Sequence, residues 1–298
     1  MNSGPVGGCS RSERALGAVL GSAVGDALGA PFEFGPEGAF SARFPVAGQG
    51  GEMCGGGGWD PGEATDDTQM AVLVAESLLE CGGLQLPDMF RRFRQWAVAD
   101  PKDIGLQTEA VLTSGAPWDL AAALHFQSSQ RGAGNGALMR AAPSAVWEGT
   151  AVFHELVRVA LEGGDPLDAV AETLRYVHPD HRERYGVVLA PDWHPDLATE
   201  FNGAVWPCLA SAVWALRTTA SYEDAVRAAI DLGGDTDTVA AVTGALAGAV
   251  YGGAAIPERW VEALRVPLPG FGDRVLRVAE LGELARRLDH GAADSPAS

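Results

Sequence analysis

Two runs of acidic and hydroxyl side chains stand immediately before apolar, helix-forming stretches. The first is Thr-Asp-Asp-Thr at 65–68, and the second is Asp-Thr-Asp-Thr at 235–238, after a pair of glycines. Capping a helix requires a single such residue, whereas each run offers four oxygen-bearing side chains in succession. The pattern leaves two interpretations open: two well-capped helices, or a site for a hard divalent cation, Mg²⁺ or Mn²⁺ rather than Zn²⁺.

The charge of the chain bears on what such a site could bind. There are 39 acidic and 21 basic residues, which gives a formal net charge of −18. Negative charge repels phosphate groups at long range, so a nucleic-acid partner is not expected. A phosphorylated ligand would need a local positive charge. A cation that relieved the mutual repulsion of Asp235 and Asp237 would supply it.

A glutamate follows directly on the predicted end of the first long helix. Residues 25–33 read GDALGAPFE, and Pro31 prevents the helix from continuing. Glu33 is therefore either an ordinary surface residue or a carboxylate that a rigid turn holds in a site.

A glycine-rich stretch, 132–136, opens another predicted helix. Free backbone N–H groups at such a helix start could hold a phosphate, although the stretch could equally be a flexible loop with a glycine cap. It is not a dinucleotide fingerprint, because the GxGxxG spacing fails at Ala137 and no strand pattern precedes it.

Several enzyme classes are excluded by what the sequence lacks. The one lysine, Lys102, lies outside any Gly-Lys-Ser/Thr motif, so there is no P-loop. The His-Glu pair at 154–155 does not continue to HExxH, and GxSxG is absent. The four cysteines form no CxxC pair, which is typical of reduced thiols and predicts a cytoplasmic protein. With no signal-peptide core and no uninterrupted apolar run long enough for a bilayer, no membrane partner is expected.

Helical periodicity dominates the chain, and alternating strand patterns are almost absent. The sequence predicts an all-α fold: a single domain over 11–290, with flexible tails at 1–10 and 291–298. Small residues stud several helices and permit close helix–helix approach. Irregular structure is expected at 34–62 and 178–195. Helices are expected at 12–28, 64–80, 87–98, 105–113, 117–126, 136–147, 151–162, 166–177, 199–217, 221–231, 236–251, 257–264 and 273–288.

Four motifs in this order resemble the ADP-ribosylglycohydrolase family, which includes the dinitrogenase reductase-activating glycohydrolases and the vertebrate ADP-ribosylarginine and ADP-ribosylserine hydrolases. The resemblance spans about residues 15–255, and the pairing of TDDT with GGDTDT is specific. It implies a compact, mostly orthogonal multi-helix bundle with two Mg²⁺ or Mn²⁺ ions at its centre. The motifs are GSAVGDALGAPFEF at 21–34, EATDDTQMA at 63–71, GNGALMRAAP at 134–143 and DLGGDTDTVAAVTGALAGAVYG at 231–252.

By motif position, the resemblance implies roles for individual residues. Glu33, Asp66 and Asp67 would be the catalytic carboxylates, with Glu33 matching the acidic residue that acts as a gate or acid/base in some members. The implied substrate loop, around the diphosphate and distal ribose, is Gly132, Ala133, Gly134, Asn135 and Gly136. The implied metal ligands are Thr65, Asp66, Asp67, Asp235, Asp237 and Thr238.

The implied reaction is hydrolysis of the glycosidic bond that links ADP-ribose to a modified protein side chain or small acceptor. The implied partner is accordingly an ADP-ribosylated protein or a small ADP-ribosyl compound. Two alternatives stay open. One is a hydrolase of O-acetyl-ADP-ribose or another ribosyl compound, and the other is a non-catalytic member that binds ADP-ribose.

The resemblance has one departure. Family members usually carry a Thr-His segment, on a helix after the Met-Arg-x-Ala-Pro motif, near the adenosyl end of the ligand. Here Pro143 is followed by SAVWEGT at 144–150, so the Thr-His element is shortened away, and the surroundings of His178 do not match it. The departure leaves both carboxylate clusters intact and affects the residues expected to bind the adenosyl end of the ligand.

Overall fold

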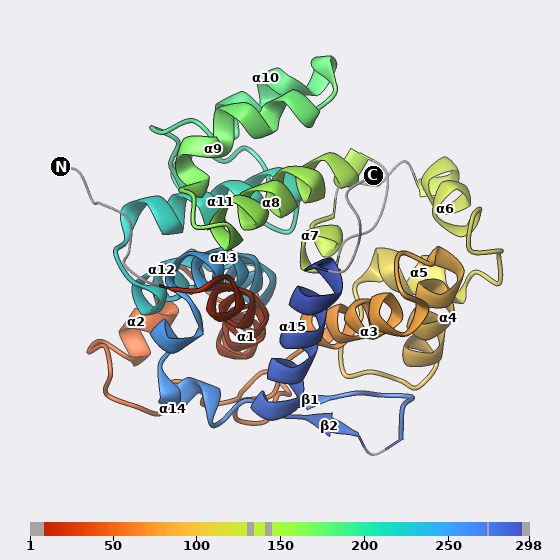
Figure 1. The fold of residues 1–298 in the computed structure, drawn as a ribbon, viewed down its shortest axis with the longest axis horizontal. Coiled ribbons are helices and arrows are strands. Elements are labelled where there is room, and N and C mark those ends of the chain that lie inside the picture. The colour runs from red at the N-terminus through yellow and green to blue at the C-terminus, as the bar shows by residue number, and fades with distance from the viewer. Residues whose placement is uncertain (1–8, 130–133, 141–144, 273, 294–298) are drawn as a thin grey trace.

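The computed structural model describes residues 9–129, 134–140, 145–272 and 274–293. Within these ranges the chain forms fifteen α-helices and one antiparallel pair of short strands, β1 (Val266–Pro267) and β2 (Val275–Leu276) (Figure 1). The predicted all-α fold is confirmed. The helices are α1 (Arg11–Gly29), α2 (Ala39–Arg43), α3 (Asp66–Cys81), α4 (Leu86–Ala97), α5 (Leu106–Thr113), α6 (Ala121–Ser129), α7 (Gly136–Arg140), α8 (Ala145–Leu161), α9 (Pro166–Thr173), α10 (Pro179–Val188), α11 (Val205–Thr218), α12 (Tyr222–Ile230), α13 (Thr236–Tyr251), α14 (Glu258–Val261) and α15 (Val278–Ala293).

The centre of the fold is a pair of helices, α1 and α13, packed almost backbone to backbone. Small residues recur every four positions along α1, so they form one stripe on the helix surface, and a matching stripe runs along α13 in the opposite direction. A methyl group added at any of the four glycines of α1 would lie 2.1–2.4 Å from a backbone oxygen of α13. The facing positions are Gly17, Gly21, Gly25 and Gly29 with Gly248, Gly244, Ala240 and Thr236.

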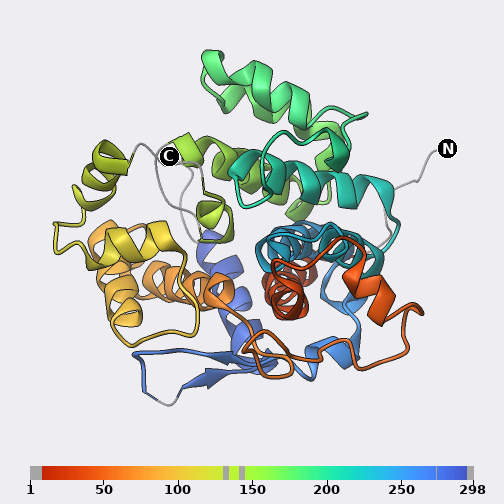
Figure 2. The same cartoon turned by 180° about the vertical axis from the view of Figure 1, so that it is seen from behind.

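The other helices surround this pair. Helices α11 and α12 pack on α13, while α15 packs on α1 and α8 contacts both central helices. Seen from either side, α1 and α13 lie at the centre and α3 lies beyond α15 (Figures 1 and 2). This arrangement brings three element ends to one place: the C-terminus of α1 and the N-termini of α3 and α13.

Several local predictions differ from the structure. The stretch 34–62, predicted to be irregular, contains α2. The predicted helices at 136–147 and 151–162 are instead the short α7 and the longer α8, and the helix predicted at 273–288 is α15, which begins at Val278. The stretch 178–195 is not irregular throughout, because α10 forms within it, capped by the side chain of His178. Helix α11 begins at Val205 rather than at 199, and residues 199–204 form a loop that reaches the acidic clusters. Helix α6 begins at Ala121, four residues later than predicted.

The segment Arg11–Phe32 is long and apolar enough to cross a membrane by length and composition. It contains α1 and the short 3₁₀-helix η1 (Ala30–Phe32). In the structure 67% of its apolar window is buried inside the protein. The close packing against α13 gives this segment the surroundings of a core helix.

Candidate functional site

The first acidic cluster forms the opening turn of α3, and a carboxylate from α1 holds that turn in place. Thr65 is the N-cap, and its side chain accepts a hydrogen bond from the Asp67 N–H. Asp26, fully buried, accepts hydrogen bonds from the backbone N–H groups of Thr65 and Thr68 at 3.0 Å each. Asp26 thus satisfies amide groups that a helix start leaves unpaired. Burial raises its pKa to about 6.

The second cluster forms the start of α13 and meets the first across the site. The Thr236 hydroxyl donates to the Gly29 carbonyl at 2.9 Å, which ties α13 to the end of α1. The Thr238 hydroxyl donates to Asp67 Oδ2 at 3.3 Å. The two clusters are 171 residues apart in sequence at this contact, and the tight α1–α13 packing brings them together.

Glu33 is held beside the second cluster by its neighbours in the chain. The Phe34 N–H donates to the Gly234 carbonyl at 2.6 Å, and the Gly234 N–H donates to the Gly35 carbonyl at 3.3 Å. As a result, carboxylate oxygens of Glu33, Asp235 and Asp237 all lie within 4.8 Å of one another. The turn after α1 therefore places Glu33 in the cluster rather than on an open surface.

Two asparagines fix Asp235 from the opposite side. Asn135 Nδ2 donates to Asp235 Oδ2 at 2.9 Å, and Asn202 Oδ1 accepts from the Asp235 N–H at 3.0 Å. The Asn135 N–H also donates to the Gly203 carbonyl at 3.0 Å, which joins the two loops. Gly234 has φ +72°, and an added Cβ there would lie 2.4 Å from Asn202 Oδ1, so this position requires glycine.

The site concentrates negative charge in a buried place. Burial, followed by repulsion from Asp103 and from three further aspartates, raises the pKa of Glu33 to about 8. Burial together with neighbouring carboxylates also raises the pKa of Asp67 and of Asp237 well above the usual range. Carboxylates so close together cannot all ionise without a counter-charge.

A bound hard cation explains the oxygen-bearing side chains at the site better than helix capping alone does. Thr65 does cap α3, but Asp235, at the N-cap position of α13, makes no capping bond with its side chain. Asp67 Oδ1 is buried and has no hydrogen-bond partner among the described residues. An acceptor oxygen buried without a donor is costly, and a divalent cation with oxygen ligands would satisfy it.

The structure gathers most of the residues that the sequence singled out. Thr65, Asp66, Asp67, Asp235, Asp237 and Thr238 occupy the two facing helix starts, and Glu33 joins them. Gly134 pairs with Ala204, Asn135 holds Asp235, and Gly136 begins α7. Gly132 and Ala133 lie outside the described residues.

Asp26 and Asn202 were missed by the sequence reasoning. Asp26 lies in the quoted motif at 21–34, and its signal is a charged residue among small apolar ones on a buried helix. Asn202 was hidden because 199–204 was predicted to be helical, although its Asn-Gly pair is a turn signal.

Two phenylalanines flank the carboxylate cluster in sequence. Phe34 follows Glu33, and Phe201 precedes Asn202 in the loop before α11. Their rings stack with centroids 6.5 Å apart, and both side chains are largely exposed. A pair of exposed aromatic rings therefore lies next to the carboxylate cluster.

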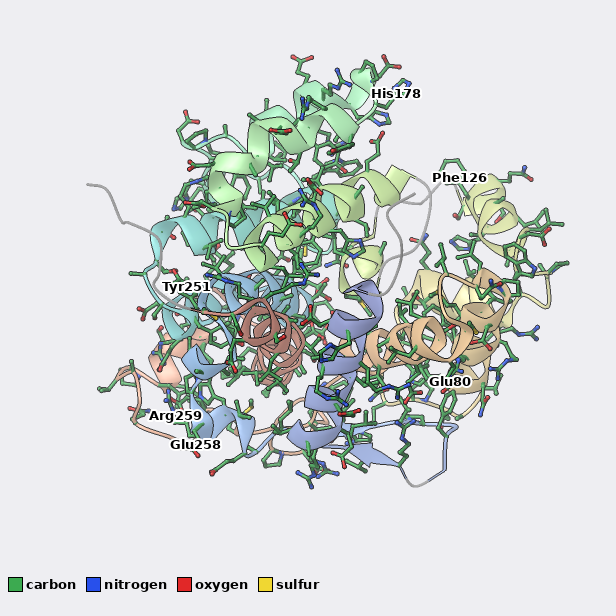
Figure 3. The ribbon with its side chains drawn as sticks, viewed as in Figure 1. Glu80, Phe126, His178, Tyr251, Glu258 and Arg259 are labelled. Atoms are coloured by element: carbon green, nitrogen blue, oxygen red, sulfur yellow. The ribbon has the colours of Figure 1, made fainter. Side chains whose placement is uncertain are left out.

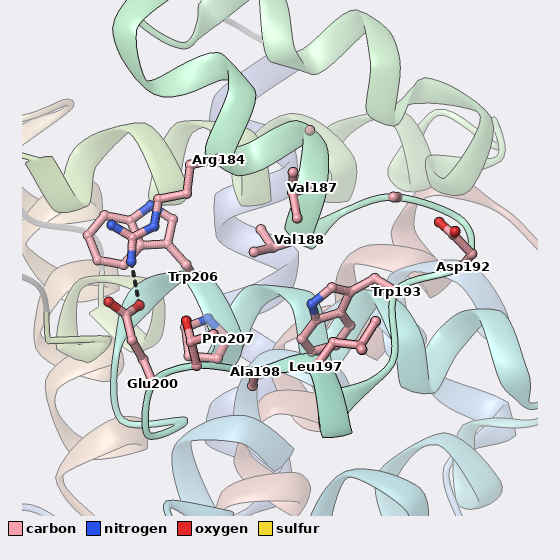
Figure 4. Close-up of a pocket in the computed structure, with 13 residues that line it drawn as sticks. Arg184, Val187, Val188, Asp192, Trp193, Leu197, Ala198, Glu200, Trp206 and Pro207 are labelled. Carbon is pink, nitrogen blue, oxygen red and sulfur yellow. Dashed lines mark hydrogen bonds and ion pairs between the residues drawn. The ribbon is translucent and has the colours of Figure 1, made fainter.

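A separate cavity of about 600 Å³ lies on the α10 side of the loop that carries Asn202. Trp193, Leu197 and Pro207 are among the apolar side chains that line it. At one edge Arg184 stacks over the Trp206 ring and forms an ion pair with Glu200 (Figure 4). None of the predicted site residues lines this cavity, so it is distinct from the carboxylate cluster.

Comparison with known proteins supplies the family. The sequence profile of the ADP-ribosylglycohydrolase family matches residues 9–150 and 144–296. The ADP-ribosyl-[dinitrogen reductase] glycohydrolase of Rhodospirillum rubrum is 30% identical over 287 residues, covering 86% of this chain and 92% of that protein. The ADP-ribosylarginine hydrolase Tri1 of Serratia proteamaculans is 29% identical over 289 residues, covering 85% and 75%.

A solved structure agrees with these sequence matches. It is described as an ADP-ribosylglycohydrolase-related protein complex, and it superimposes with a TM-score of 0.71 at 32% sequence identity. The match covers 95% of this chain and 99% of the other. The order of the motifs, the facing acidic helix starts and these matches agree, and the chain belongs to the ADP-ribosylglycohydrolase family of hydrolases.

Proposed function

We propose that this protein hydrolyses the bond between the distal ribose of ADP-ribose and an arginine side chain, with two Mg²⁺ or Mn²⁺ ions bound at the carboxylate cluster. The observation that carries the proposal is the convergence of Glu33, Asp67, Asp235 and Asp237 at the meeting point of α1, α3 and α13. The arginine acceptor follows the activity for which the Serratia relative is named.

The residues that would hold the ions come from both helix starts. They are Thr65, Asp66, Asp67, Asp235, Asp237 and Thr238. When bound, Mg²⁺ or Mn²⁺ supplies Lewis acidity, neutralises the carboxylates and acidifies water at the site. Asn135 and Asn202 keep Asp235 oriented, and Asp26 ties the first turn of α3 to α1.

Hydrolysis adds water across the ribosyl–nitrogen bond. A carbon–oxygen bond forms at the anomeric carbon, the carbon–nitrogen bond breaks, and the leaving guanidine nitrogen gains a proton. Glu33 is suited to carry a proton because its carboxylate lies within 4.8 Å of carboxylate oxygens of Asp235 and Asp237, and in the metal-free protein its surroundings raise its pKa to about 8. In this role Glu33 takes a proton from the attacking water or delivers one to the leaving nitrogen.

The deciding experiment measures ADP-ribose release from ADP-ribosyl-arginine with Mg²⁺, with Mn²⁺ and with EDTA. Serine-linked ADP-ribose and O-acetyl-ADP-ribose serve as parallel substrates. Release from the arginine linkage that EDTA abolishes supports the proposal. Release from another linkage instead would show that the acceptor is not arginine.

A second measurement separates catalysis from binding. If no substrate is cleaved, calorimetric titration with ADP-ribose in the presence of Mn²⁺ tests the non-catalytic alternative. Tight binding without turnover would reject the proposed activity in favour of a binding role.

A further inference from the structure

We propose that Phe34 and Phe201 form the acceptor subsite, in which the guanidinium group of the modified arginine lies against their rings. The inference rests on the proposed function and names the residues that would select a cationic acceptor over a neutral one. It is drawn from the place of the two rings beside the carboxylate cluster, from the backbone of Phe34 and from the chemistry of exposed aromatic faces.

The Phe201 ring lies beside the carboxylate of Asp235. A Cβ added to Gly203 would meet the Phe201 ring at 2.9 Å and Asp235 Oδ2 at 3.2 Å, so the ring and the carboxylate border the same small space. Asp235 is also one of the three carboxylates whose oxygens lie within 4.8 Å of one another. A molecule bound at these carboxylates would therefore have the Phe201 ring within reach.

Phe34 has an unusual backbone conformation for an aromatic residue. Its φ is +58°, and it is one of two described residues other than glycine with a positive φ. Bulky side chains rarely adopt this left-handed conformation, because it crowds the Cβ atom. The hydrogen bond from the Phe34 N–H to the Gly234 carbonyl requires a turn here, but glycine would form that turn without strain. The turn therefore does not explain an aromatic side chain at this position.

Packing in the core does not explain the aromatic pair either. Phe34 is 74% exposed and Phe201 is 57% exposed, although their rings stack on one another. A ligand that covered both rings would remove this apolar surface from water, which is favourable. Because Phe34 directly follows Glu33, the proposed carrier of the proton, the part of the substrate nearest to the rings is the bond that is cleaved, with the acceptor on one side of it.

The chemistry of the exposed rings favours a planar cation. The negative π face of an aromatic ring repels a phosphate and attracts a cation. A guanidinium group is both cationic and planar, so it can stack flat on such a face. Elsewhere in the chain several aromatic rings already lie under an arginine, as Trp206 does. Among the described residues, by contrast, no cation lies over either ring of the pair, which leaves both faces for the acceptor.

The test replaces each ring by leucine, which is apolar but has no π face. With ADP-ribosyl-arginine as substrate, Phe34→Leu and Phe201→Leu should each raise KM about two- to fivefold, the factor that a cation–π contact at an exposed site supplies. The inhibition constant of the product ADP-ribose should stay at the wild-type value, because ADP-ribose lacks the acceptor. Phe34→Tyr keeps the aromatic face and should keep the wild-type KM.

Tyr176→Leu is the matched control, and it should change neither constant. Tyr176 is as exposed as Phe201, at 57%, and it ends the short 3₁₀-helix η2 (Leu174–Tyr176) before α10. Figure 3 labels His178, two residues later in the chain, at the edge of the molecule and away from α1 and α13.

A wild-type KM for ADP-ribosyl-arginine in both leucine variants would overturn the inference. So would a parallel rise in the inhibition constant of ADP-ribose, because the rings would then bind the nucleotide rather than the acceptor. A fall in kcat at an unchanged KM would overturn it as well, because Phe34 would then act only by positioning Glu33.

A binding measurement keeps the inference separate from the proposed function. N-butylguanidine carries a guanidinium group, and N-butylurea is its uncharged counterpart. In saturation-transfer NMR with Mg²⁺ and ADP-ribose present, the wild type should bind N-butylguanidine but not N-butylurea. Phe34→Leu and Phe201→Leu should bind N-butylguanidine about two- to fivefold more weakly.

The two proposals can then fail independently. If the wild type shows this binding, the leucine variants weaken it, and no arginine linkage is cleaved, the subsite stands and the arginine-hydrolase proposal fails. If the wild type cleaves the linkage but all three forms bind N-butylguanidine equally, the subsite is refuted and the proposed activity stands.

Discussion

The packing of α1 against α13 predicts that a single methyl group will destabilise the whole fold. Gly248 faces Gly17, and an added Cβ on Gly248 would lie 1.9 Å from the Gly17 carbonyl oxygen and 2.5 Å from its carbon. Ordinary contact begins at 3.4 Å, so one helix must shift by roughly 1.5 Å. Because the obstacle is backbone, no side-chain rotation can relieve it.

The expected cost can be worked from two opposing terms. Overpacking of a tight interior costs typically about 1–3 kcal/mol, and backbone-to-backbone contact places Gly248→Ala at the upper end. Alanine recovers about 1 kcal/mol of helix propensity over glycine. The net loss is about 2 kcal/mol, which for a chain of this size lowers Tm by about 4 °C.

The assay is thermal and urea unfolding of Gly248→Ala beside a matched control. Gly186 lies within α10, and an added Cβ there meets nothing within 4 Å. Gly186→Ala should therefore raise stability by about 0.5–1 kcal/mol. A Gly248→Ala protein as stable as the Gly186→Ala protein would refute the view that the stripe holds the two helices at contact distance.

The site itself yields three further predictions. Asp67→Asn should weaken Mn²⁺ binding about tenfold or more in calorimetric titration, because it replaces a carboxylate ligand. The same change should raise the Tm of the metal-free protein, because one of several repelling carboxylates is gone. Unchanged Mn²⁺ affinity would show that Asp67 is not a ligand. Since the folded-state pKa of Glu33 is raised from 4.5 to about 8, its contribution to stability is present below about pH 4.5 and is lost as pH rises through 8. The stability of metal-free Glu33→Gln relative to wild type should accordingly increase from pH 5 to pH 8 in urea unfolding, and a flat difference would contradict the assigned surroundings of Glu33. Asp26→Ala should lower the free energy of unfolding by about 1–3 kcal/mol, because it leaves the buried amides of Thr65 and Thr68 without an acceptor. It should also lower the affinity for Mn²⁺. A stable variant with normal affinity would show that the first turn of α3 needs no support from α1.

Most helices and both acidic clusters could be predicted from the sequence, because their signals are local. Each cluster is a contiguous run in a first helical turn, where short polar residues concentrate. Glu33 was identifiable because a proline ends the preceding helix and so fixes where the chain turns. Helix α10 was the main omission. The prolines and histidines of the stretch 178–195 suggested irregular structure, although Pro179 occupies a first helical position, where proline is well tolerated.

The supporting residues Asp26 and Asn202 could not be predicted from the sequence, because their hydrogen-bond partners are distant along the chain. Asp26 holds amides 39 and 42 residues away, and Asn202 holds one 33 residues away. Such pairs depend on how helices pack, and helix periodicity carries no information about which helix faces which. The misassignment of 199–204 followed for the same reason, because a tertiary contact with Asp235 decides the conformation of that loop.

The sequence by itself determined the helical class, the carboxylate-rich chemistry and the four-residue spacing of small side chains along α1. These follow from local backbone preferences and from the period of the α-helix. Only the tertiary structure decided that the stripe on α1 meets α13, and that their ends bring Glu33, Asp67 and Asp237 together. Burial and mutual repulsion then raise the pKa values of those carboxyl groups, and both effects exist only once the chain is packed.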